Sequence, residues 1–564
     1  MTTQTATAPV TARTCSPEGR VTRSLLGYGP LAGTVFVGSI FLQGLTRRGF
    51  SIPHDDASLL ANGPLGWIQV TTFLVAGVMT IAAAVGAHRA MASRWAPRLL
   101  GIYGASLMAA GLLRADPADG FGPGAPVGKA AHISWHGYGH LISASIGFIA
   151  LIAACFVVVA AFAVLPPAGS TDTLNYATFG RIAVLGHNPY VMTPNQLART
   201  GDPLGDLATQ IWRRHGSLYG PLATVEQRAA AELGGTSPAR IIFWLKLWNA
   251  IVFLGVVIGL DRMLRSDPAR RARAHLLWSL NPLVLWGLVA SGHLDAFAVA
   301  ASFFGLALVR TRRVERPGSP EPEIRGPEPL VALAAGLLVG VAADFMLTYL
   351  LLAAALAWAL RRWPAALLSA AAGLAVAVVP AYLWAGRPLI HSLLLRRGKV
   401  SADNFYQLFS AAYRHPLPPS VDLAVVLVFG ALALLLLWRL PDVAPDLPVL
   451  QPALAIGIAW LFVWYYQLPW YDVMIIALLA LYSASRLDYV VIVQLTAGSL
   501  VMMPGGSGNE PPLGWLRTVS HEIWFTWAPL VLLGCVLAVI ALCLTGAWNF
   551  GPRPEIGRPV RTGA

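Results

Sequence analysis

Long apolar segments follow one another along almost the whole chain, separated by short polar connections. About 20 apolar residues are enough to cross the hydrocarbon core of a bilayer as a helix. Backbone amides inside lipid must find their hydrogen-bond partners within the segment, so these runs can only be helices. The sequence therefore predicts an all-α fold, a polytopic transmembrane helical bundle. The expected spans lie near residues 25–45, 66–87, 97–113, 138–165, 241–260, 274–290, 295–310, 330–360, 365–385, 422–439, 451–466, 472–485, 489–503 and 525–546.

The composition agrees with a membrane protein and argues against a nucleic-acid partner. Of the 564 residues, 56% are hydrophobic and only 12% are charged, a balance outside the range of soluble domains. The net charge of +13 comes from Lys and Arg in short connections, where they orient spans and meet anionic lipid head groups of the bilayer. The four cysteines show no metal-ligand spacing and say nothing about disulfides or zinc. No cofactor and no metal-binding residue is named from the sequence, which does not fix whether the protein depends on a metal.

Basic connections set the expected orientation of the spans. Connections rich in Arg are retained on the cytoplasmic side, which places the long polar loop of residues 166–240 outside the cytoplasmic membrane. The segment 330–360 must then turn near Asp344, because only a turn there leaves both of its basic ends on one side. The connections expected to be cytoplasmic are 262–273, 310–325, 361–362 and the C-terminal tail.

The N-terminal third of the chain does not fit this orientation. Its basic residues near 88–98 are typical of a cytoplasmic loop, yet the span count places them outside. Residues 74–162 resemble a small family of bacterial membrane proteins of unknown function, which suggests two membrane modules joined at about 150–165. The expected organisation is a disordered tail 1–24, a four-helix membrane module 25–165, an external catalytic loop 166–240, a transmembrane bundle 241–546 and a cytoplasmic tail 547–564, with a flexible connection at 314–329.

The polar loop 166–240 is the expected active-site loop, because it gathers carboxylate, aromatic, Gly and Pro residues between membrane spans. Asp172 follows a Pro-Pro break that ends a span, so its carboxylate is placed at the outer membrane surface. There it could act as a general base towards an acceptor hydroxyl. The alternative is that Asp172 caps a helix beginning at Thr173, since Asp is among the best N-cap residues.

A helix lying along the membrane surface is expected directly after Asp172, because apolar residues recur there at helical spacing. Arg181 falls on its polar side and could contact a lipid phosphate or simply be solvated. Two turns follow, and their aromatic rings could stack on a sugar or anchor the loop at the interface. The candidate substrate-binding residues of the loop are Tyr176, Arg181, Asn188, Tyr190 and Tyr219.

Two later turns between closely spaced spans face the same side as the polar loop. His293 and Asp295 lie in the first turn, and ionisable groups at membrane depth are usually functional, although turn capping is the alternative. Trp470 and Tyr471 lie in the second turn, where a residue of the interfacial aromatic belt is the alternative for Trp470.

A basic cluster is also expected on the outer face. Arg396 and Arg397 lie in the connection 387–415. Basic residues outside the membrane depart from the usual charge distribution, and an anionic lipid phosphate is one reason to place them there.

From about residue 165 onward, the chain resembles the actinobacterial polyprenol-phosphate-mannose-dependent α-1,6-mannosyltransferases, which are integral-membrane glycosyltransferases of the GT-C class. The resemblance rests on several motifs that occur in order over roughly the last 400 residues of the chain. They are Pro166-Pro167-Ala-Gly-Ser170-Thr-Asp172-Thr-Leu-Asn175-Tyr176, Gly180-Arg181, Gly186-His-Asn188-Pro189-Tyr190, Tyr219-Gly220-Pro221-Leu222, Gly292-His293-Leu-Asp295 and Pro469-Trp470-Tyr471.

The resemblance implies transfer of mannose from a polyprenyl-phosphate donor to a mannan or lipoglycan acceptor, at the outer face of the cytoplasmic membrane. The essential acidic residue of that class maps to Asp172. Inversion at the sugar carbon needs a single base, so Asp172 would deprotonate the acceptor 6-hydroxyl. Arg181, with Arg396 or Arg397, would neutralise the departing phosphate, and His293 and Asp295 would bind sugar hydroxyls.

Two other functions remain open from the sequence. A transporter or flippase for a lipid-linked substrate is expected to show repeated halves and helices broken at mid-membrane, and no duplication is visible in the sequence. A membrane protein with impaired catalysis is made plausible by the unusual N-terminal third.

Overall fold

The computed structural model describes residues 17–549 except for 53–54, 91–93, 127, 129, 131, 165–166, 168–169, 211, 315–322, 395–398, 402–403, 409–418 and 502–525. Helices make up 74% of the chain, which confirms the expected all-α bundle. The contacts divide the chain into two compact units, of which one contains the described residues up to 161 and the other those from 162 onward.

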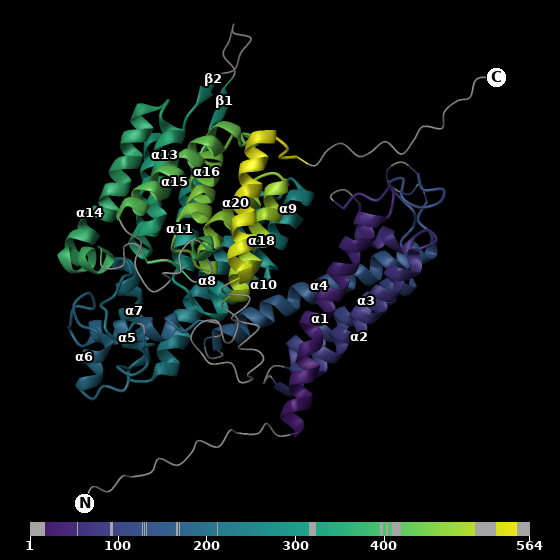
Figure 1. Ribbon diagram of the computed structural model, residues 1–564, viewed down its shortest axis with the longest axis horizontal. Coiled ribbons are helices and arrows are strands. Elements are labelled where there is room, and N and C mark those ends of the chain that lie inside the picture. The colour runs from purple at the N-terminus through teal and green to yellow at the C-terminus, as the bar shows by residue number, and fades with distance from the viewer. Residues whose placement is uncertain are drawn as a thin grey trace, which may run out of the picture. The chain divides into compact units, whose positions relative to one another are not determined.

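The first unit is built from four long helices (Figure 1). Helix α2 packs along both α1 and α3. A pair of glycines allows the close approach of α2 and α3, because a Cβ atom on Gly77 would lie 2.7 Å from the carbonyl oxygen of Gly104. Such small-residue contacts are typical of helix packing in membranes. The helices are α1 (Pro17–Thr46), α2 (Gly66–Ala90), α3 (Trp95–Leu112) and α4 (Trp135–Val164), with a short turn η1 (Ala57–Ala61) before α2.

Polar side chains also join α1 to α2 within their apolar surroundings. The Gln43 side-chain amide donates a hydrogen bond of 2.8 Å to the Gln69 side chain, and the hydroxyls of Ser39 and Thr72 lie 2.7 Å apart. Buried polar groups must be paired to avoid a desolvation cost. These contacts therefore fix the register between the two helices.

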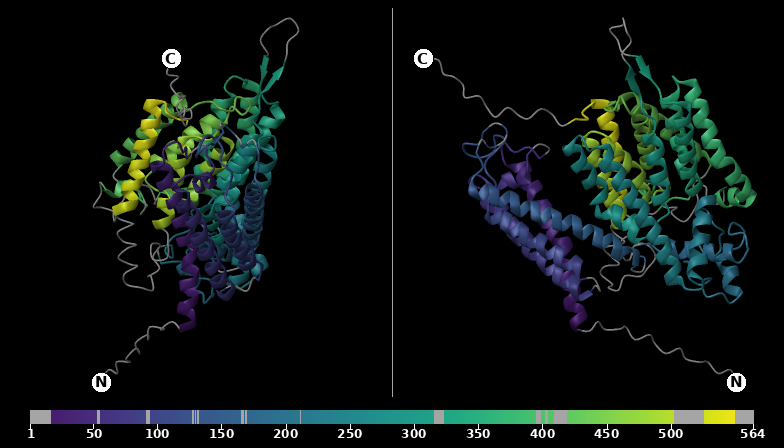
Figure 2. Two further views of the ribbon diagram at one scale, coloured as in Figure 1. Left: turned by 90° about the vertical axis from the view of Figure 1, so that its right-hand side faces the viewer. Right: turned by 180° about the vertical axis from the view of Figure 1, so that it is seen from behind.

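The second unit consists of a layer of long and broken helices with three shorter helices at one end (Figures 1 and 2). The three are α5 (Asp172–Val184), α6 (Pro194–Arg199) and α7 (Pro221–Gly234). The remaining elements are α8 (Pro238–Met263), α9 (Pro268–Ala274), η2 (His275–Ser279), α10 (Pro282–Val284), η3 (Leu285–Ala290), α11 (Asp295–Ala307), β1 (Arg312–Val314), β2 (Glu323–Arg325), α12 (Pro329–Phe345), η4 (Leu347–Leu350), α13 (Leu351–Leu360), α14 (Pro364–Leu394), η5 (Phe405–Leu408), α15 (Pro419–Arg439), α16 (Leu450–Val463), η6 (Pro469–Asp472), α17 (Val473–Leu481), α18 (Arg486–Val501) and α20 (Ala528–Thr545).

Six described helices are long and apolar enough to cross a membrane, which identifies a multi-pass membrane protein. They are α1, α2, α8, α14, α15 and α20. Several other expected spans form shorter apolar helices, or a helix pair bent by 118° between α9–η3 and α11. These segments are apolar and helical as expected, but several are broken or shorter than a full membrane span.

The breaks in these segments follow from their sequence. Gly292 has a left-handed backbone with φ of 72°, which a glycine adopts without strain, and it separates η3 from α11. Helix α12 ends at Phe345 because Met346 is extended, with φ of −141° and ψ of 115°. The turn expected near Asp344 therefore falls where the helix ends.

A short β-hairpin lies at the end of the second unit opposite to α5, α6 and α7 (Figures 1 and 2). Its strands β1 and β2 pair antiparallel, with Arg313 opposite Ile324. The connection expected to be flexible at 314–329 therefore contains the last residue of β1 and the whole of β2.

Helix α5 forms where it was expected, but it does not lie free on a membrane surface. Its residues Tyr176, Phe179 and Ile182 are at most 2% exposed, and α5 packs against α7 and α8. Gly180 permits this packing, because a Cβ atom there would lie 2.1 Å from the carbonyl oxygen of Gln227. The apolar side of α5 is thus covered by protein.

Candidate active site

One cavity of about 820 Å³ is lined by six of the twelve site residues that the sequence singled out. Its walls come from α5, the loop before α7, the start of α11, the break after α12 and the segment 460–471. Non-helical backbone at membrane depth is tolerated where it lines a cavity, and three of the broken segments do so here. The candidate residues that line it are Asp172, Tyr176, Tyr219, Asp295, Trp470 and Tyr471.

Asp172 is the first residue of α5, and its side chain is 17% exposed. The carboxylate accepts a hydrogen bond of 3.4 Å from the side-chain amide of Asn175, one turn further along the helix. No backbone N–H among the described residues donates to this carboxylate, which would be the mark of an N-cap. Asp172 therefore lines the cavity without making the hydrogen bond of a helix cap.

Burial tunes the acidity of the site. It raises the pKa of the Asp172 carboxyl to about 6, and the hydrogen bond from Asn175 acts in the opposite direction. A carboxylate with a pKa near 6 is a competent base close to neutral pH. Burial also raises the pKa of the Tyr219 hydroxyl well above its usual range, so this group is a hydrogen-bond donor and not a base.

The aromatic residues beside Asp172 form an ordered wall. The rings of Tyr176 and Tyr219 meet edge to face, with centroids 4.8 Å apart. Trp460 and Tyr471 lie 5.8 Å apart on the opposite elements α16 and η6. Aromatic rings combine apolar faces with polar edges, so such a wall suits the faces and hydroxyls of a sugar ring.

Asp295 lines the same cavity at the start of α11 and is 1% exposed. Its Oδ1 atom has no hydrogen-bond partner among the described residues. A buried carboxylate oxygen without a partner is costly, and a hydroxyl of a bound substrate would satisfy it. Within the described part of the chain, no group of three or more His, Cys, Asp and Glu side chains is placed to hold a metal ion.

His293 is fully buried and lies behind residues that line the cavity. Its Nδ1 atom lies 3.7 Å from Oδ2 of Asp172 and 3.4 Å from the hydroxyl oxygen of Tyr176. Its ring stacks on that of Trp470, with centroids 3.7 Å apart and an interplanar angle of 16°. His293 thus contacts three of the residues that line the cavity.

The cavity is also lined by apolar side chains, among them Leu347, Leu351, Leu394 and Phe429. Lys399 also lines the cavity, and its ammonium lies 5.8 Å from the centre of the Trp212 ring. Arg396 and Arg397 lie outside the described residues.

Arg181, Asn188 and Tyr190 are not among the residues that line the cavity. Asn188 shapes a turn, because its Oδ1 accepts a hydrogen bond of 2.8 Å from the amide of Tyr190. Tyr190 is buried, and its hydroxyl lies 2.8 Å from that of Thr224 on α7. The structure therefore gives these three residues contacts within the loop and does not bring them to the cavity; their substrate-binding role stays a prediction.

Arg181 is engaged with another loop residue. Its Nε donates a hydrogen bond of 2.8 Å to Asp202, and the two side chains are 17% and 9% exposed. Arg181→Gln is expected to destabilise the protein by roughly 1.5 kcal/mol, the value of a charged hydrogen bond in a partly buried pair. The measurement is the melting temperature in detergent.

The matched control for Arg181→Gln is Arg228→Gln. Arg228 pairs with Glu232 at 2.8 Å, but these side chains are 57% and 51% exposed. An exposed pair contributes little to stability, so this variant should melt like the wild type. Equal melting temperatures for all three proteins would show that the Arg181–Asp202 pair does not hold the loop.

Several lining residues were missed in the sequence. They are aromatic residues of the segments around 212 and 460–466, namely Trp212, Trp460, Trp464, Tyr465 and Tyr466. The dense aromatic run just before Trp470 was the available signal for the last four. No motif around Trp212 in the sequence identifies it as a site residue, because the folding of the loop brings it to the cavity.

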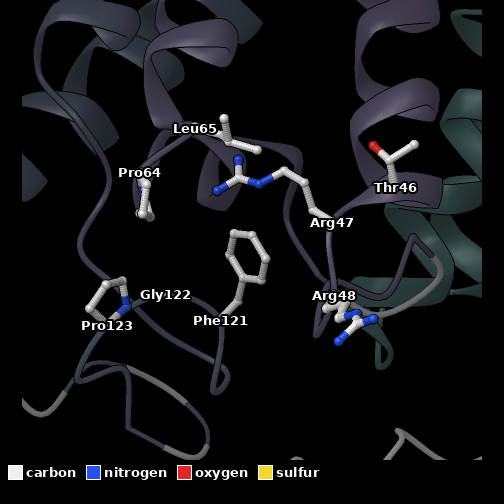
Figure 3. A pocket seen from close by; sticks show the side chains of 9 residues that line it. Thr46, Arg47, Arg48, Pro64, Leu65, Phe121, Gly122 and Pro123 are labelled. Atoms are coloured by element: carbon white, nitrogen blue, oxygen red, sulfur yellow. The ribbon is translucent and has the colours of Figure 1, made fainter.

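A second cavity of about 470 Å³ lies in the first unit, beside the end of α1 (Figure 3). The Arg47 guanidinium reaches over the ring of Phe121 at 4.8 Å. It also donates hydrogen bonds of 2.5 Å to the carbonyls of Leu60 and Asn62. Arg47 therefore ties the loop before α2 to the end of α1, and no carboxylate lines this cavity.

Comparison with known proteins gives one family match. Residues 30–194 match a family described as Protein of unknown function (DUF998). The match covers the described part of the first unit from residue 30 and continues through α5 to the turn at Asn188–Tyr190. No curated protein and no solved structure matches the chain.

Proposed function

We propose that the protein is an inverting glycosyltransferase that moves mannose from a polyprenyl-phosphate donor to a mannan acceptor. The observation that carries this proposal is the cavity, in which a carboxylate with a pKa of about 6 lies beside an aromatic wall. The same cavity continues between apolar side chains such as Leu351 and Phe429. This combination fits a sugar that is attached to a lipid.

In the proposed reaction, Asp172 accepts the proton of the acceptor hydroxyl as its oxygen attacks the anomeric carbon. The new glycosidic bond forms while the bond from that carbon to the phosphate oxygen breaks, and polyprenyl phosphate leaves with the bonding electrons. Attack from the opposite face inverts the sugar carbon with one base. Asp295 and the hydroxyls of Tyr176 and Tyr219 are available to bind sugar hydroxyls.

The leaving phosphate needs a positive charge nearby. Lys399 lines the cavity together with the apolar side chains of Leu394 and Phe429. We assign it the neutralising role, in place of Arg181, which pairs with Asp202. Arg396 and Arg397 belong to the same connection and stay candidates for this role.

A transporter of a lipid-linked substrate is the second candidate. The helices interrupted at Gly292 and Met346 meet at the cavity, and broken helices around a central site are typical of transporters. The two candidates differ in whether a glycosidic bond is made.

The experiment that separates them uses the purified protein in lipid vesicles. Radiolabelled polyprenyl-phosphate mannose is supplied with a mannan oligosaccharide, and the products are separated after incubation. Label in the oligosaccharide supports the transferase. Label that crosses the bilayer while still attached to the polyprenyl phosphate supports the transporter and contradicts our proposal.

The pKa of Asp172 predicts a pH dependence of the transfer reaction. The base is active as a carboxylate, and a pKa of about 6 means that it is protonated below that pH. The kcat/KM for transfer should therefore fall about tenfold per pH unit below pH 6 and be level above it. Donor binding, measured over the same range, is the control, and a flat kcat/KM from pH 5 to 8 would contradict the assignment.

A further inference from the structure

His293 lies behind the wall of the cavity and not in it, so it is not placed to contact a substrate. It is fully buried and is not among the residues that line the cavity, yet it touches Asp172, Tyr176 and Trp470, which do line it. These three residues come from two elements far apart in sequence, α5 and η6. A buried side chain that joins such residues can set their relative positions.

The backbone around His293 is held from two sides. Its carbonyl oxygen accepts a hydrogen bond of 3.1 Å from the side-chain amide of Asn249 on α8. The Thr173 hydroxyl donates to the carbonyl of Ser291, which lies on the other side of the left-handed Gly292. The imidazole is thus fixed relative to α5, where Thr173 follows Asp172.

The surroundings select the form of the ring. Nε2 has no hydrogen-bond partner among the described residues, and a buried N–H left unpaired is costly. Nδ1 faces two oxygen atoms, the Asp172 carboxylate at 3.7 Å and the Tyr176 hydroxyl at 3.4 Å. The neutral ring with its proton on Nδ1 therefore fits best, because that proton points towards acceptors.

We propose that His293 is a positioning residue, whose Nδ1–H orients the Asp172 carboxylate while its ring supports Trp470. This inference rests on the proposed function, in which Asp172 is the base. One side chain thereby sets the distance between the proton acceptor and the aromatic wall. The Nδ1–H group lies 3.7 Å from Oδ2 of Asp172, and at this distance its dipole favours the charged form of the carboxylate.

The other groups that face Asp172 have different effects on its carboxylate. Asn175 also donates to it. Asp295, at the start of α11, lines the same cavity, and the Asp172 carboxylate interacts electrostatically with it and with the hydroxyls of Tyr176, Tyr219 and Tyr471. On α8, the Lys246 side chain lies beside Gly292 and Thr173. If the His293 N–H is removed, the side-chain amide of Asn175 still donates to the Asp172 carboxylate and favours its charged form.

Two substitutions separate the roles of the ring and the donor. His293→Phe keeps a flat ring for Trp470 but removes the N–H. His293→Asn removes the ring but keeps a neutral donor close to the position of Nδ1, because the asparagine amide nitrogen has the same spacing from the backbone. His293→Leu replaces His293→Phe if that variant fails to fold, since it also lacks a donor.

The deciding measurement does not depend on activity. The infrared band of the protonated Asp172 carboxyl is identified by its absence in Asp172→Asn and is followed during a pH titration of the full chain in detergent. The pKa of Asp172 should rise by up to about one unit in His293→Phe, because the carboxylate loses the N–H dipole that faces it. It should stay near the wild-type value in His293→Asn. Equal pKa values in His293→Phe and the wild type, or equal shifts in both variants, would overturn the proposal.

Kinetics give the second readout if the wild type transfers mannose. A misplaced base should lower kcat about 10- to 100-fold in His293→Phe, with KM nearly unchanged. His293→Asn should recover most of this kcat but raise KM about threefold, because Trp470 loses its stacking partner. A wild type without transfer activity would refute the proposed function alone, since the infrared titration still decides the role of His293.

Discussion

Asp172→Asn should lower the kcat for mannose transfer by roughly 10²- to 10⁴-fold, the usual contribution of a positioned general base. Asparagine has the same shape as aspartate, so the fit of α5 against its neighbours is retained. It cannot accept a proton at neutral pH, and the acceptor hydroxyl must then attack without a base. The KM for the lipid donor should change little, because the apolar part of the cavity is unaltered.

The measurement is the initial rate of label transfer by purified wild type and variant in the same vesicles. Asp206→Asn is the matched control, since Asp206 lies in the same polar loop but its side chain is 75% exposed and 3.5 Å from Arg213. Exposed pairs of this kind contribute little to stability, so the control should transfer within about twofold of the wild type. Equal rates for Asp172→Asn and the wild type would remove Asp172 from the mechanism.

The fold was predictable because apolar segments of about 20 residues have few alternatives in a membrane. The break after Asp344 was also predictable from the charges at both ends of that segment. The division of other segments into short helices was not, because hydropathy records the apolar character of a run and not its continuity. A single residue such as Gly292 can end a helix without lowering the hydropathy of its neighbourhood.

Part of the candidate site was predictable because short sequence spacings fix it. Asp172 and Tyr176 are four residues apart on one helix and therefore share a face, and both line the cavity. Trp470 and Tyr471 were found from their place in a turn between spans. Their meeting with Asp172 depends on tertiary contacts, such as the stack of His293 on Trp470, which the sequence does not record.

The predicted site residues that do not line the cavity show the limit of residue chemistry alone. Arg181 has the charge that a phosphate site needs, but Asp202, in the same loop, satisfies that charge. Tyr190 has the ring that a sugar site needs, but it packs against Ala385 and Leu389 of α14. Structural and functional uses of Arg and Tyr look alike in sequence, and only the partner distinguishes them.

The small residues of α5 carried a signal of a different kind. An amphipathic pattern shows that one face of a helix is apolar. That face can contact a membrane surface, as we predicted for α5, or another part of the protein. Ala177 and Gly180 lie one turn apart, and such small residues are typical of a helix that is closely approached by another. Their presence favours burial by protein, as observed with α7.

Gly180→Ala should destabilise the protein strongly, because the added methyl group meets the backbone of α7. The added Cβ would lie 2.1 Å from the carbonyl oxygen and 2.7 Å from the carbonyl carbon of Gln227, and 3.2 Å from the Cβ of Ala231. Backbone atoms cannot rotate away as a flexible side chain can, so α5 and α7 must separate. Overpacking of this kind costs on the order of 3 kcal/mol, and the shift moves Asp172 because it lies on the same helix.

The control for Gly180→Ala is Gly255→Ala, in the interior of α8, where an added Cβ would meet no atom within 4 Å. Both changes place alanine in a helix interior, where alanine is favoured over glycine, so helix propensity alone predicts the same effect on both. A lower melting temperature and slower transfer in Gly180→Ala only would therefore isolate the α5–α7 contact as their cause. If both variants melt like the wild type, the close approach of α5 and α7 is not what positions the proposed base.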